Sequence, residues 1–246
     1  MIAALLLGRK GSVGFPGKNT YPLLGMTMME YPLTAALESK YVDEVYVSTD
    51  DEEIMEIARN HNAKVIVRPP ELATKDALGE NAYLHGYRWI KEHSKENIEF
   101  MVLLFCNAPT ILPGQIDKGI EVLRKHPEYD SAVTASCYNM WSPLRARKIG
   151  KDGLLHPFVP FETFGDPKTL NCSRDSQGDS WFADMGVSIV RPKNLENIEE
   201  GLLPQKWMGK KIFPIKQEAG CDVDYEFQMP QVEYWIKKYR NGAKNG

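Results

Sequence analysis

The stretch IAALLLGRKGSVGFPGKN, residues 2–19, decides how the rest of the chain is interpreted. Its first part, Ile2–Leu7, is a continuous apolar run, which is typical of a strand buried on both faces of a parallel sheet. Its second part, 8–19, contains four glycines and three cations, namely Arg9, Lys10 and Lys18. Glycines let backbone N–H groups approach a phosphate closely, and Arg or Lys side chains neutralise its charge. The stretch therefore predicts a buried strand followed by a phosphate-binding loop, with a purely structural turn as the alternative.

The loop ends in Gly-Lys but is not a P-loop. A P-loop has four residues between its two glycines and a Ser or Thr after its lysine. Here five residues separate Gly11 from Gly17, and Asn19 follows Lys18. The loop must therefore be a phosphate-binding loop of another kind if it binds phosphate at all.

Strands and helices alternate along the chain after this loop. Apolar runs predict strands, and apolar residues at helical spacing predict helices. The expected strands are 42–49, 64–67, 100–105, 131–136, 185–190 and 211–215, and the expected helices are 28–39, one capped by Asp50 or Asp51, 81–93, 115–125 and 231–239. This alternation predicts an α/β fold with a parallel, layered sheet. Ligands bind beyond the carboxyl ends of such strands, so we expect 8–19, 48–51 and 106–110 to converge.

Composition limits the function classes. The chain has 246 residues, of which 43% are hydrophobic, so we expect a single domain over residues 1–246 with a substantial core. The net charge of −3 gives no electrostatic reason to expect a nucleic acid or an anionic membrane as partner. The first apolar run is too short for a signal peptide or a membrane span, so we expect a cytoplasmic protein. The four scattered cysteines predict free, mostly buried thiols.

The alternating pattern stops in the segment 141–182. This segment is rich in Pro, Gly, Phe and Trp and has no helical period. We interpret it as an excursion from the sheet, either a hairpin arm, a lid or a dimer contact.

The segment CDVDYE, residues 221–226, places Asp222 and Asp224 two positions apart. In an extended segment these side chains point the same way, and two carboxylates beside a triphosphate can bind Mg²⁺. A solvated loop pair is the alternative. Asn107, which follows the strand expected at 100–105, could hydrogen-bond a ligand or could be a turn residue before Pro109.

These residues resemble the acylneuraminate cytidylyltransferases, or CMP-sialic acid synthetases. The signature of that family reads approximately ARGGSKGIPGKN after its first strand, and this chain has GRKGSVGFPGKN in the same register. The stretch 42–77 is also similar to the family, and DVDYEFQ at 222–228 matches its late IDIDTPEDL element. The resemblance covers most of residues 1–140, weakens in the excursion and returns at 222–228.

The resemblance implies transfer of a cytidylyl group from CTP to a 2-keto sugar acid, with Mg²⁺ as cofactor and pyrophosphate as product. It implies a Rossmann-like, mostly parallel sheet with helices on both faces, and a homodimer whose dimerisation arm is 141–182. Four residues would be catalytic, with Arg9 and Lys18 on the CTP phosphates and Asp222 and Asp224 on the metal. The nucleotide site would also contain Gly8, Lys10, Gly11, Ser12, Asn19 and Asn107. Arg174 would pair with the carboxylate of the sugar acid.

The chain departs from the family at several of these positions. Val13 stands where the family has a lysine, and Lys10 replaces a glycine. The family's QPTSPLR is 105–111 here, without the glutamine and the arginine. Related Kdo cytidylyltransferases have an aspartate about where Asn107 lies. These departures leave open another nucleotide or sugar, or an inactive sugar-nucleotide-binding protein, although the retained paired aspartates favour an enzyme.

Overall fold

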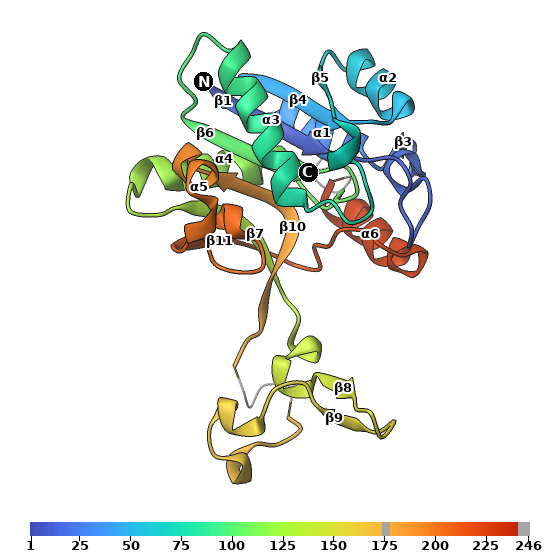
Figure 1. Cartoon of the computed structure of the whole chain (residues 1–246), viewed down its shortest axis with the longest axis vertical. Helices are drawn as coiled ribbons and strands as arrows, with labels where there is room; N and C mark the ends of the chain where they lie inside the picture. Colours follow the sequence, from blue (N-terminus) through green and yellow to red (C-terminus); the bar gives the residue numbers. More distant parts are fainter. Residues whose placement is uncertain (174–177, 241–246) are drawn as a thin grey trace.

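The computed structural model describes residues 1–173 and 178–240. A layered body carries a long arm that extends away from it (Figure 1). The body contains a seven-stranded sheet of order β11-β7-β10-β6-β1-β4-β5. Its strands are β1 (Ile2–Leu7), β4 (Glu44–Thr49), β5 (Lys64–Val67), β6 (Phe100–Phe105), β7 (Ser131–Cys137), β10 (Trp181–Val190) and β11 (Ile212–Gln217).

The sheet is mostly parallel, as the sequence predicts. β1 pairs in parallel with both β4 and β6, β4 pairs so with β5, and β11 with β7. β10 is antiparallel to its neighbours β6 and β7. Two short antiparallel pairs lie outside the sheet, β2 (Pro22–Leu23) with β3 (Met26–Thr27) and β8 (Arg147–Ile149) with β9 (Leu155–Pro157).

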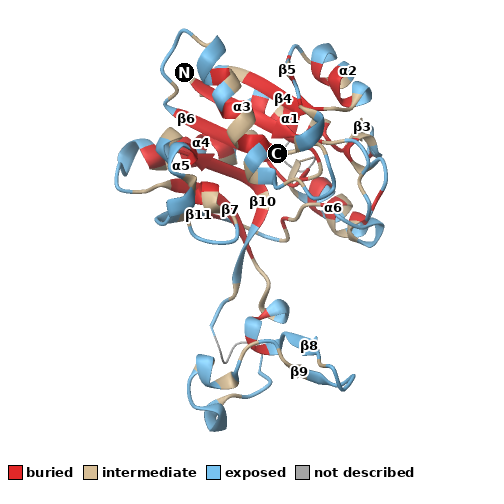
Figure 2. Cartoon of the chain, viewed as in Figure 1, coloured by how far each residue is buried: buried red, intermediate tan, exposed pale blue. Residues whose placement is uncertain are grey.

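Helices cover both faces of the sheet, which confirms the predicted layers. They are α1 (Glu30–Leu37), α2 (Glu52–Asn60), α3 (Gly79–His93), α4 (Pro113–Lys125), α5 (Pro192–Glu196) and α6 (Met229–Trp235), which continues into a π-helical turn at Ile236–Arg240. Side chains of a strand point alternately to the two faces. Ala4 and Leu6 of β1 therefore join the core under α1, α2 and α4, whereas Leu5 and Leu7 join the core under α3 and α5. Figure 2 shows the central strands buried throughout.

A third core connects the two ends of the chain. Phe15 of the glycine-rich loop packs in one cluster with Val223, which lies between the two aspartates. Val232 and Trp235 of α6 and Tyr31 of α1 complete this cluster. The apolar packing therefore holds the carboxylate segment beside the glycine-rich loop.

The arm connects β7 to β10. Its stalk is the end of these two strands, where Trp181 is the partner of Cys137 and Phe182 the partner of Ser136. Trp181 and Phe182, which we expected to belong to the irregular excursion, are therefore strand residues. The local sequence did not indicate a strand here, because it depends on pairing with β7. Beyond the stalk, the arm contains the β8–β9 hairpin and several short 3-10 turns (Figure 1).

The cysteine prediction is half correct. All four cysteines are free, but only Cys106 is fully buried, and Cys172 is exposed on the arm. In the described parts of the chain, no helix has both the length and the apolar character needed to cross a membrane.

Candidate active site

A cavity of about 570 Å³ opens at the carboxyl ends of β1, β5 and β6. It brings together residues from both ends of the chain. Its lining includes eight of the predicted site residues: Gly8, Arg9, Ser12, Lys18, Asn19, Asn107, Asp222 and Asp224.

The three expected segments converge at this edge of the sheet. The Gly8 N–H donates to the Ser48 carbonyl at 3.2 Å, and the Cys106 N–H donates to the Leu7 carbonyl at 2.9 Å. The Lys10 N–H donates to Asp50 Oδ1 at 2.9 Å. Asp51 caps α2 by accepting from the Glu53 N–H, which decides between the two caps, Asp50 and Asp51, that the sequence left open.

The glycine-rich loop is held open by its own polar contacts. Gly11 and Gly17 have φ angles of 73° and 72°, a conformation that favours glycine. The Arg9 guanidinium donates to the Gly11 carbonyl at 3.1 Å, and Asn19 Nδ2 donates to the Arg9 carbonyl at 3.2 Å. The loop therefore has a defined shape before any ligand binds.

The loop also packs directly on the carboxylate segment. A Cβ at Gly14 would lie 2.6 Å from the Asp224 carbonyl oxygen and 3.2 Å from the Tyr225 ring. Lys18 Nζ lies 2.6 Å from Asp224 Oδ1. The cation predicted to bind phosphate and the carboxylate predicted to bind metal are thus in contact in the free chain.

Asp222 is the more buried of the two aspartates, and Asp224 is exposed. Burial, followed by the negative charge of Asp224, raises the pKa of Asp222 to about 6. A cation beside Asp222 would offset the repulsion by Asp224 that contributes to this raised pKa. The electrostatics of the pair therefore favours binding of a positive ion.

The donor set fits a magnesium ion that is shared with a nucleotide. Among the described residues, no group of three or more His, Cys, Asp or Glu side chains could hold a metal. Asp222 and Asp224 would supply two ligands, and waters and phosphate oxygens would have to supply the others. Mg²⁺ is commonly bound in this way, by one or two carboxylates and substrate phosphates.

Asn107 contributes to the site through the backbone. Its Nδ2 donates to the Val223 carbonyl at 2.9 Å, and its own carbonyl accepts from the Val223 N–H at 2.8 Å. Both peptide groups of the residue between the aspartates are therefore fixed by Asn107. The side chain lines the cavity, but its amide nitrogen is engaged in holding the carboxylate segment.

Arg68 lines the cavity and was not identified from the sequence. It is 5% exposed and directly follows β5. Its Nη2 donates to the Ser48 carbonyl at 2.6 Å and its Nε to Ser48 Oγ at 3.3 Å. Burial lowers its pKa. The rule that ligands bind at the carboxyl ends of parallel strands would have selected it.

The segment before α3 forms the wall near Arg68. Leu72, Lys75, Ala77, Leu78 and Gly79 line the cavity there. α3 begins at Gly79 without a side-chain cap at Leu78. The amino end of a helix favours negative or electron-rich ligand atoms, so this wall adds polar backbone groups to the site.

Two predicted residues lie beside the cavity and one lies outside the described part of the chain. Lys10 and Gly11 belong to the loop but are absent from the lining. Arg174 lies outside the described residues. Val13, at the position of the family lysine, lines the cavity and is 75% exposed.

The structure thus combines a Rossmann-like sheet with a cationic loop that lines one cavity together with Asp222 and Asp224. A family model described as Cytidylyltransferase matches residues 3–152, and the chain belongs to this family. The predicted family is therefore confirmed.

Curated relatives extend the likeness beyond the matched region. The N-acylneuraminate cytidylyltransferase A of Danio rerio is 28% identical over 97% of this chain and 51% of its own length. The chain thus spans about half the length of that relative. The 3-deoxy-manno-octulosonate cytidylyltransferase of Protochlamydia amoebophila is also 28% identical, over 96% of this chain and 95% of its own length.

Solved structures agree on the fold. A CMP:2-keto-3-deoxy-manno-octonic acid synthetase, solved in complex with CTP, superposes with a TM-score of 0.65. It is 16% identical and the match covers 96% of this chain and 98% of that one. At this identity the likeness establishes the Rossmann-like architecture alone.

Proposed function

We propose that this protein is a Mg²⁺-dependent cytidylyltransferase that transfers CMP from CTP to a 2-keto sugar acid and releases pyrophosphate. The observation that carries the proposal is the single cavity that joins the cationic loop to Asp222 and Asp224. The relatives named for N-acylneuraminate and for 3-deoxy-manno-octulosonate support an acceptor of the 2-keto sugar acid class.

In the proposed reaction, the anomeric hydroxyl oxygen of the acceptor attacks the α-phosphorus of CTP. The bond between this phosphorus and the oxygen bridging to the β-phosphate breaks, and pyrophosphate leaves with that electron pair. The hydroxyl proton passes to solvent. No covalent enzyme nucleophile is needed, so the work of the protein is positioning and charge stabilisation.

Arg9 and Lys18 would stabilise the departing pyrophosphate. Negative charge builds on it as the bond breaks, so cations beside it act more strongly in the transition state than in the ground state. Lys18 is paired with Asp224 in the free chain, and would have to turn from this carboxylate toward the phosphates. Ser12 and Asn19 lie in the same lining and would help to orient the nucleotide.

Asp222 and Asp224 would hold the metal ion. When bound, Mg²⁺ supplies Lewis-acid stabilisation of phosphate charge. Both side chains must be ionised for this, because a protonated carboxyl does not bind the metal. Asn107 would keep the pair in place through Val223.

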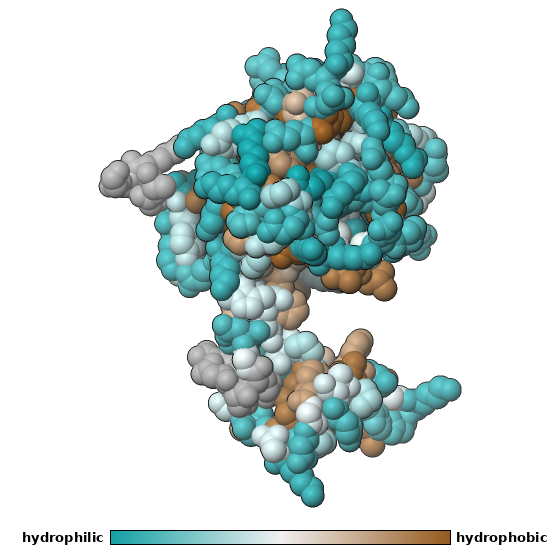
Figure 3. All heavy atoms as spheres, turned by 90° about the vertical axis from the view of Figure 1, so that its left-hand side faces the viewer, coloured by the Kyte–Doolittle hydropathy of each residue, from teal (hydrophilic) through white to brown (hydrophobic). Residues whose placement is uncertain are grey.

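We also propose that the protein is a homodimer and that the arm makes the contact. The arm exposes several large apolar side chains, namely Ile149, Leu154, Leu155 and Phe158. Figure 3 shows brown, apolar surface gathered on the arm in that view, whereas the body is mostly hydrophilic. Exposed apolar patches of this kind mark interaction sites. The free thiols are compatible with the reducing cytoplasm expected from the sequence.

The decisive experiment is pyrophosphate release with Mg²⁺, each of the four nucleoside triphosphates, and a panel containing N-acetylneuraminate and 3-deoxy-manno-octulosonate. We expect release only with CTP together with one acid class. The double variant Asp222→Asn/Asp224→Asn, with an unchanged circular dichroism spectrum, should be silent. Release with another nucleotide would replace CTP in the proposal, and CTP binding without release by any acid would favour an inactive binding protein.

A further inference from the structure

Residues at the root of the arm form hydrogen bonds with the backbone of Gly220, just before the two aspartates. The Gly220 N–H donates to Ser136 Oγ at 2.9 Å. The Tyr138 hydroxyl donates to the Gly220 carbonyl at 2.7 Å. Ser136 lies at the end of β7 and Tyr138 is the next residue but one, where the chain enters the arm. Both peptide groups around Gly220 are therefore bound by residues of the arm root.

The buried carboxyl group of Asp184 on β10 orients the hydroxyl group of Ser136. Asp184 of β10 is 4% exposed and accepts from Ser136 Oγ at 2.7 Å and from Gln217 Nε2 at 2.8 Å. With its proton directed to Asp184, the Ser136 oxygen is free to accept from Gly220. Asp184 lies at the irregularity where the β10 register shifts between Ala183 and Ser188. Both strands of the arm stalk therefore take part.

The fit around Gly220 leaves no space for a side chain. A Cβ there would lie 2.2 Å from Gln217 Nε2 and 2.6 Å from Asp184 Oδ2. Tyr138 is fixed in turn by Gln231 of α6, whose Nε2 donates to the Tyr138 hydroxyl at 2.7 Å. The contacts around Gly220 therefore form a packed hydrogen-bond network and not one isolated contact.

The chain between this network and the two carboxylates is also held by hydrogen bonds. Cys221 is held on both sides by Thr110, whose hydroxyl accepts from the Cys221 N–H at 2.9 Å and donates to its carbonyl at 3.1 Å. Val223 is held by Asn107. Asp222 is held by Gln228, whose Nε2 donates to the Asp222 carbonyl at 3.2 Å. The backbone from Gly220 to Val223 is therefore held by an unbroken series of side-chain contacts, of which those at Gly220 come from the arm root, and we expect their loss to loosen the segment that carries Asp222.

We infer that Ser136 and Tyr138 are positioning residues that set the placement of Asp222 and Asp224 from the root of the arm. This inference rests on the proposed role of the two aspartates as metal ligands. It adds a consequence, namely that a tilt of the arm stalk changes the metal affinity of the site. Residues that orient metal ligands from behind typically change metal affinity by about 10-fold to 100-fold when they are mutated.

The test compares Ser136→Ala and Tyr138→Phe with wild type, and uses Tyr234→Phe as the matched control. Tyr234 is a 51% exposed tyrosine of α6 whose hydroxyl contacts Lys238. The first readout is amide hydrogen exchange of residues 219–224 in the ligand-free protein. Loss of one buried hydrogen bond should speed exchange there by about 5-fold to 10-fold in the two arm-root variants, with the control unchanged.

The second readout is binding of Mn²⁺ in the presence of CTP, followed by electron paramagnetic resonance. We expect the dissociation constant for Mn²⁺ to rise about 10-fold in both arm-root variants and to stay at the wild-type value in Tyr234→Phe. Wild-type binding retained in both variants would overturn the inference, as would unchanged exchange at 219–224. Failure of the wild type itself to bind Mn²⁺ with CTP would instead overturn the proposed function. Thermal unfolding above the assay temperature establishes that each variant is folded.

Discussion

Lys18 and Asp224 form an ion pair across 206 positions of sequence, with Lys18 Nζ 2.6 Å from Asp224 Oδ1. The pair joins the glycine-rich loop to the carboxylate segment. In the free protein each charge neutralises the other, and in the proposed reaction each has a different partner. When nucleotide and metal bind, the contact between Lys18 and Asp224 would therefore break, and Lys18 would contact the phosphates while Asp224 would contact the metal ion.

Replacing Lys18 should impair catalysis much more than stability. We expect Lys18→Ala to lower kcat/KM about 100-fold, because it removes a cation from the developing pyrophosphate charge. The side chain of Asp224 is 60% exposed, so loss of the pair should cost less than about 1 kcal/mol of unfolding free energy. Pyrophosphate release and urea unfolding measure the two effects. Lys10→Ala should lose less activity, since Lys10 does not line the cavity.

Arg68 should be needed as an arginine and not only as a cation. Arg68→Lys keeps the positive charge but loses the planar fork that reaches Ser48, so we expect CTP affinity to fall about 10-fold. Isothermal titration with CTP tests this. Arg124→Lys is the control, because Arg124 forms a comparable two-pronged contact with Glu99 away from the cavity. Equal losses in both variants would contradict a specific role for Arg68.

The raised pKa of Asp222 predicts a pH dependence in two observables. Its pKa of about 6 lies above the usual 3.8, so the folded state holds its proton more tightly than the unfolded state. The metal-free protein should therefore lose stability as the pH rises from about 4 to about 6. Metal-dependent activity should change in the opposite sense, and fall as the pH drops through about 6. Thermal unfolding over this range, compared with Asp222→Asn, tests the first point, and pyrophosphate release by the wild type over the same range tests the second.

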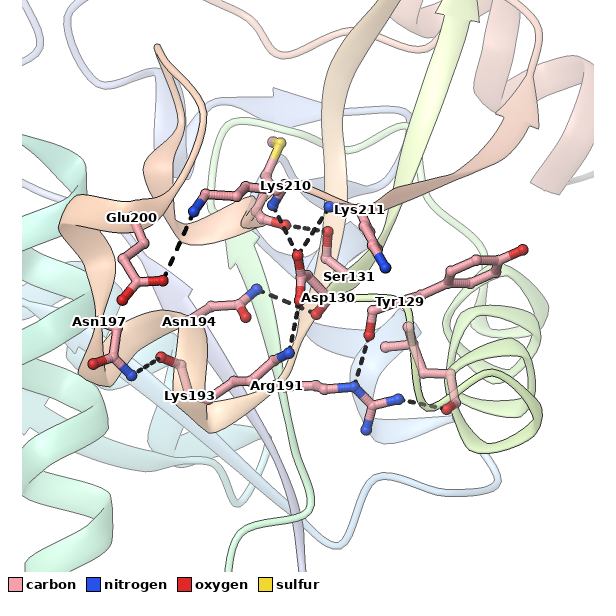
Figure 4. Close-up of polar contacts among 12 residues, drawn as sticks. Tyr129, Asp130, Ser131, Arg191, Lys193, Asn194, Asn197, Glu200, Lys210 and Lys211 are labelled. Carbon is pink, nitrogen blue, oxygen red and sulfur yellow. Dashed lines mark hydrogen bonds and ion pairs between the residues drawn. The ribbon is translucent and has the colours of Figure 1, made fainter.

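Asp130 should contribute to stability without affecting catalysis. It lies at the amino end of β7, opposite the cavity, and binds Lys193 and the N–H groups of Lys210 and Lys211 (Figure 4). Burial would raise its pKa, but these hydrogen bonds outweigh burial and lower the pKa to about 2. We expect Asp130→Asn to cost about 1–3 kcal/mol at neutral pH by urea unfolding. The difference in unfolding free energy from wild type should shrink as the pH falls from about 4 toward about 2. At neutral pH, the kcat of the variant should equal that of wild type.

Association through the arm should be sensitive to charge on its apolar side chains. Leu155 and Phe158 are 71% and 60% exposed. Leu155→Glu/Phe158→Glu should raise the dimer dissociation constant at least about 10-fold, which light scattering over a concentration series detects. Leu203→Glu, at a site on the body that is 80% exposed, should leave association unchanged. A wild-type protein that is monomeric at micromolar concentration would contradict the dimer proposal.

Much of the sheet could be predicted because local pattern determines it. β5 and β6 begin and end at the predicted residues, Lys64–Val67 and Phe100–Phe105. A short apolar run bounded by turn residues has few other stable placements. β10 was harder to describe from pattern alone. It runs antiparallel because the arm leaves the sheet at the carboxyl end of β7 and returns there, so the next strand has to run back.

The residues of the cavity could be proposed from the sequence, but their contacts could not. Motif and spacing pointed to Lys18 and Asp224 separately, and their pairing depends on the third core, which spans the length of the chain. Asn107 was expected as a ligand contact, and its backbone role appears only with Val223 beside it. Arg68 has no local pattern to mark it, since its importance comes from its position at the end of β5.

The paired stalk has a consequence for how this chain can vary. Cys137 and Trp181 are direct partners, and the Tyr138 N–H donates to the Ser180 carbonyl, so the insertion enters and leaves the body through adjacent positions. The residues between Tyr138 and Ser180 are therefore inserted at the end of two strands that already pair as a hairpin would. A two-residue turn could close that gap without moving any sheet strand. The sheet of the body therefore does not depend on the length of the insertion, and we expect a shortened arm to leave it intact.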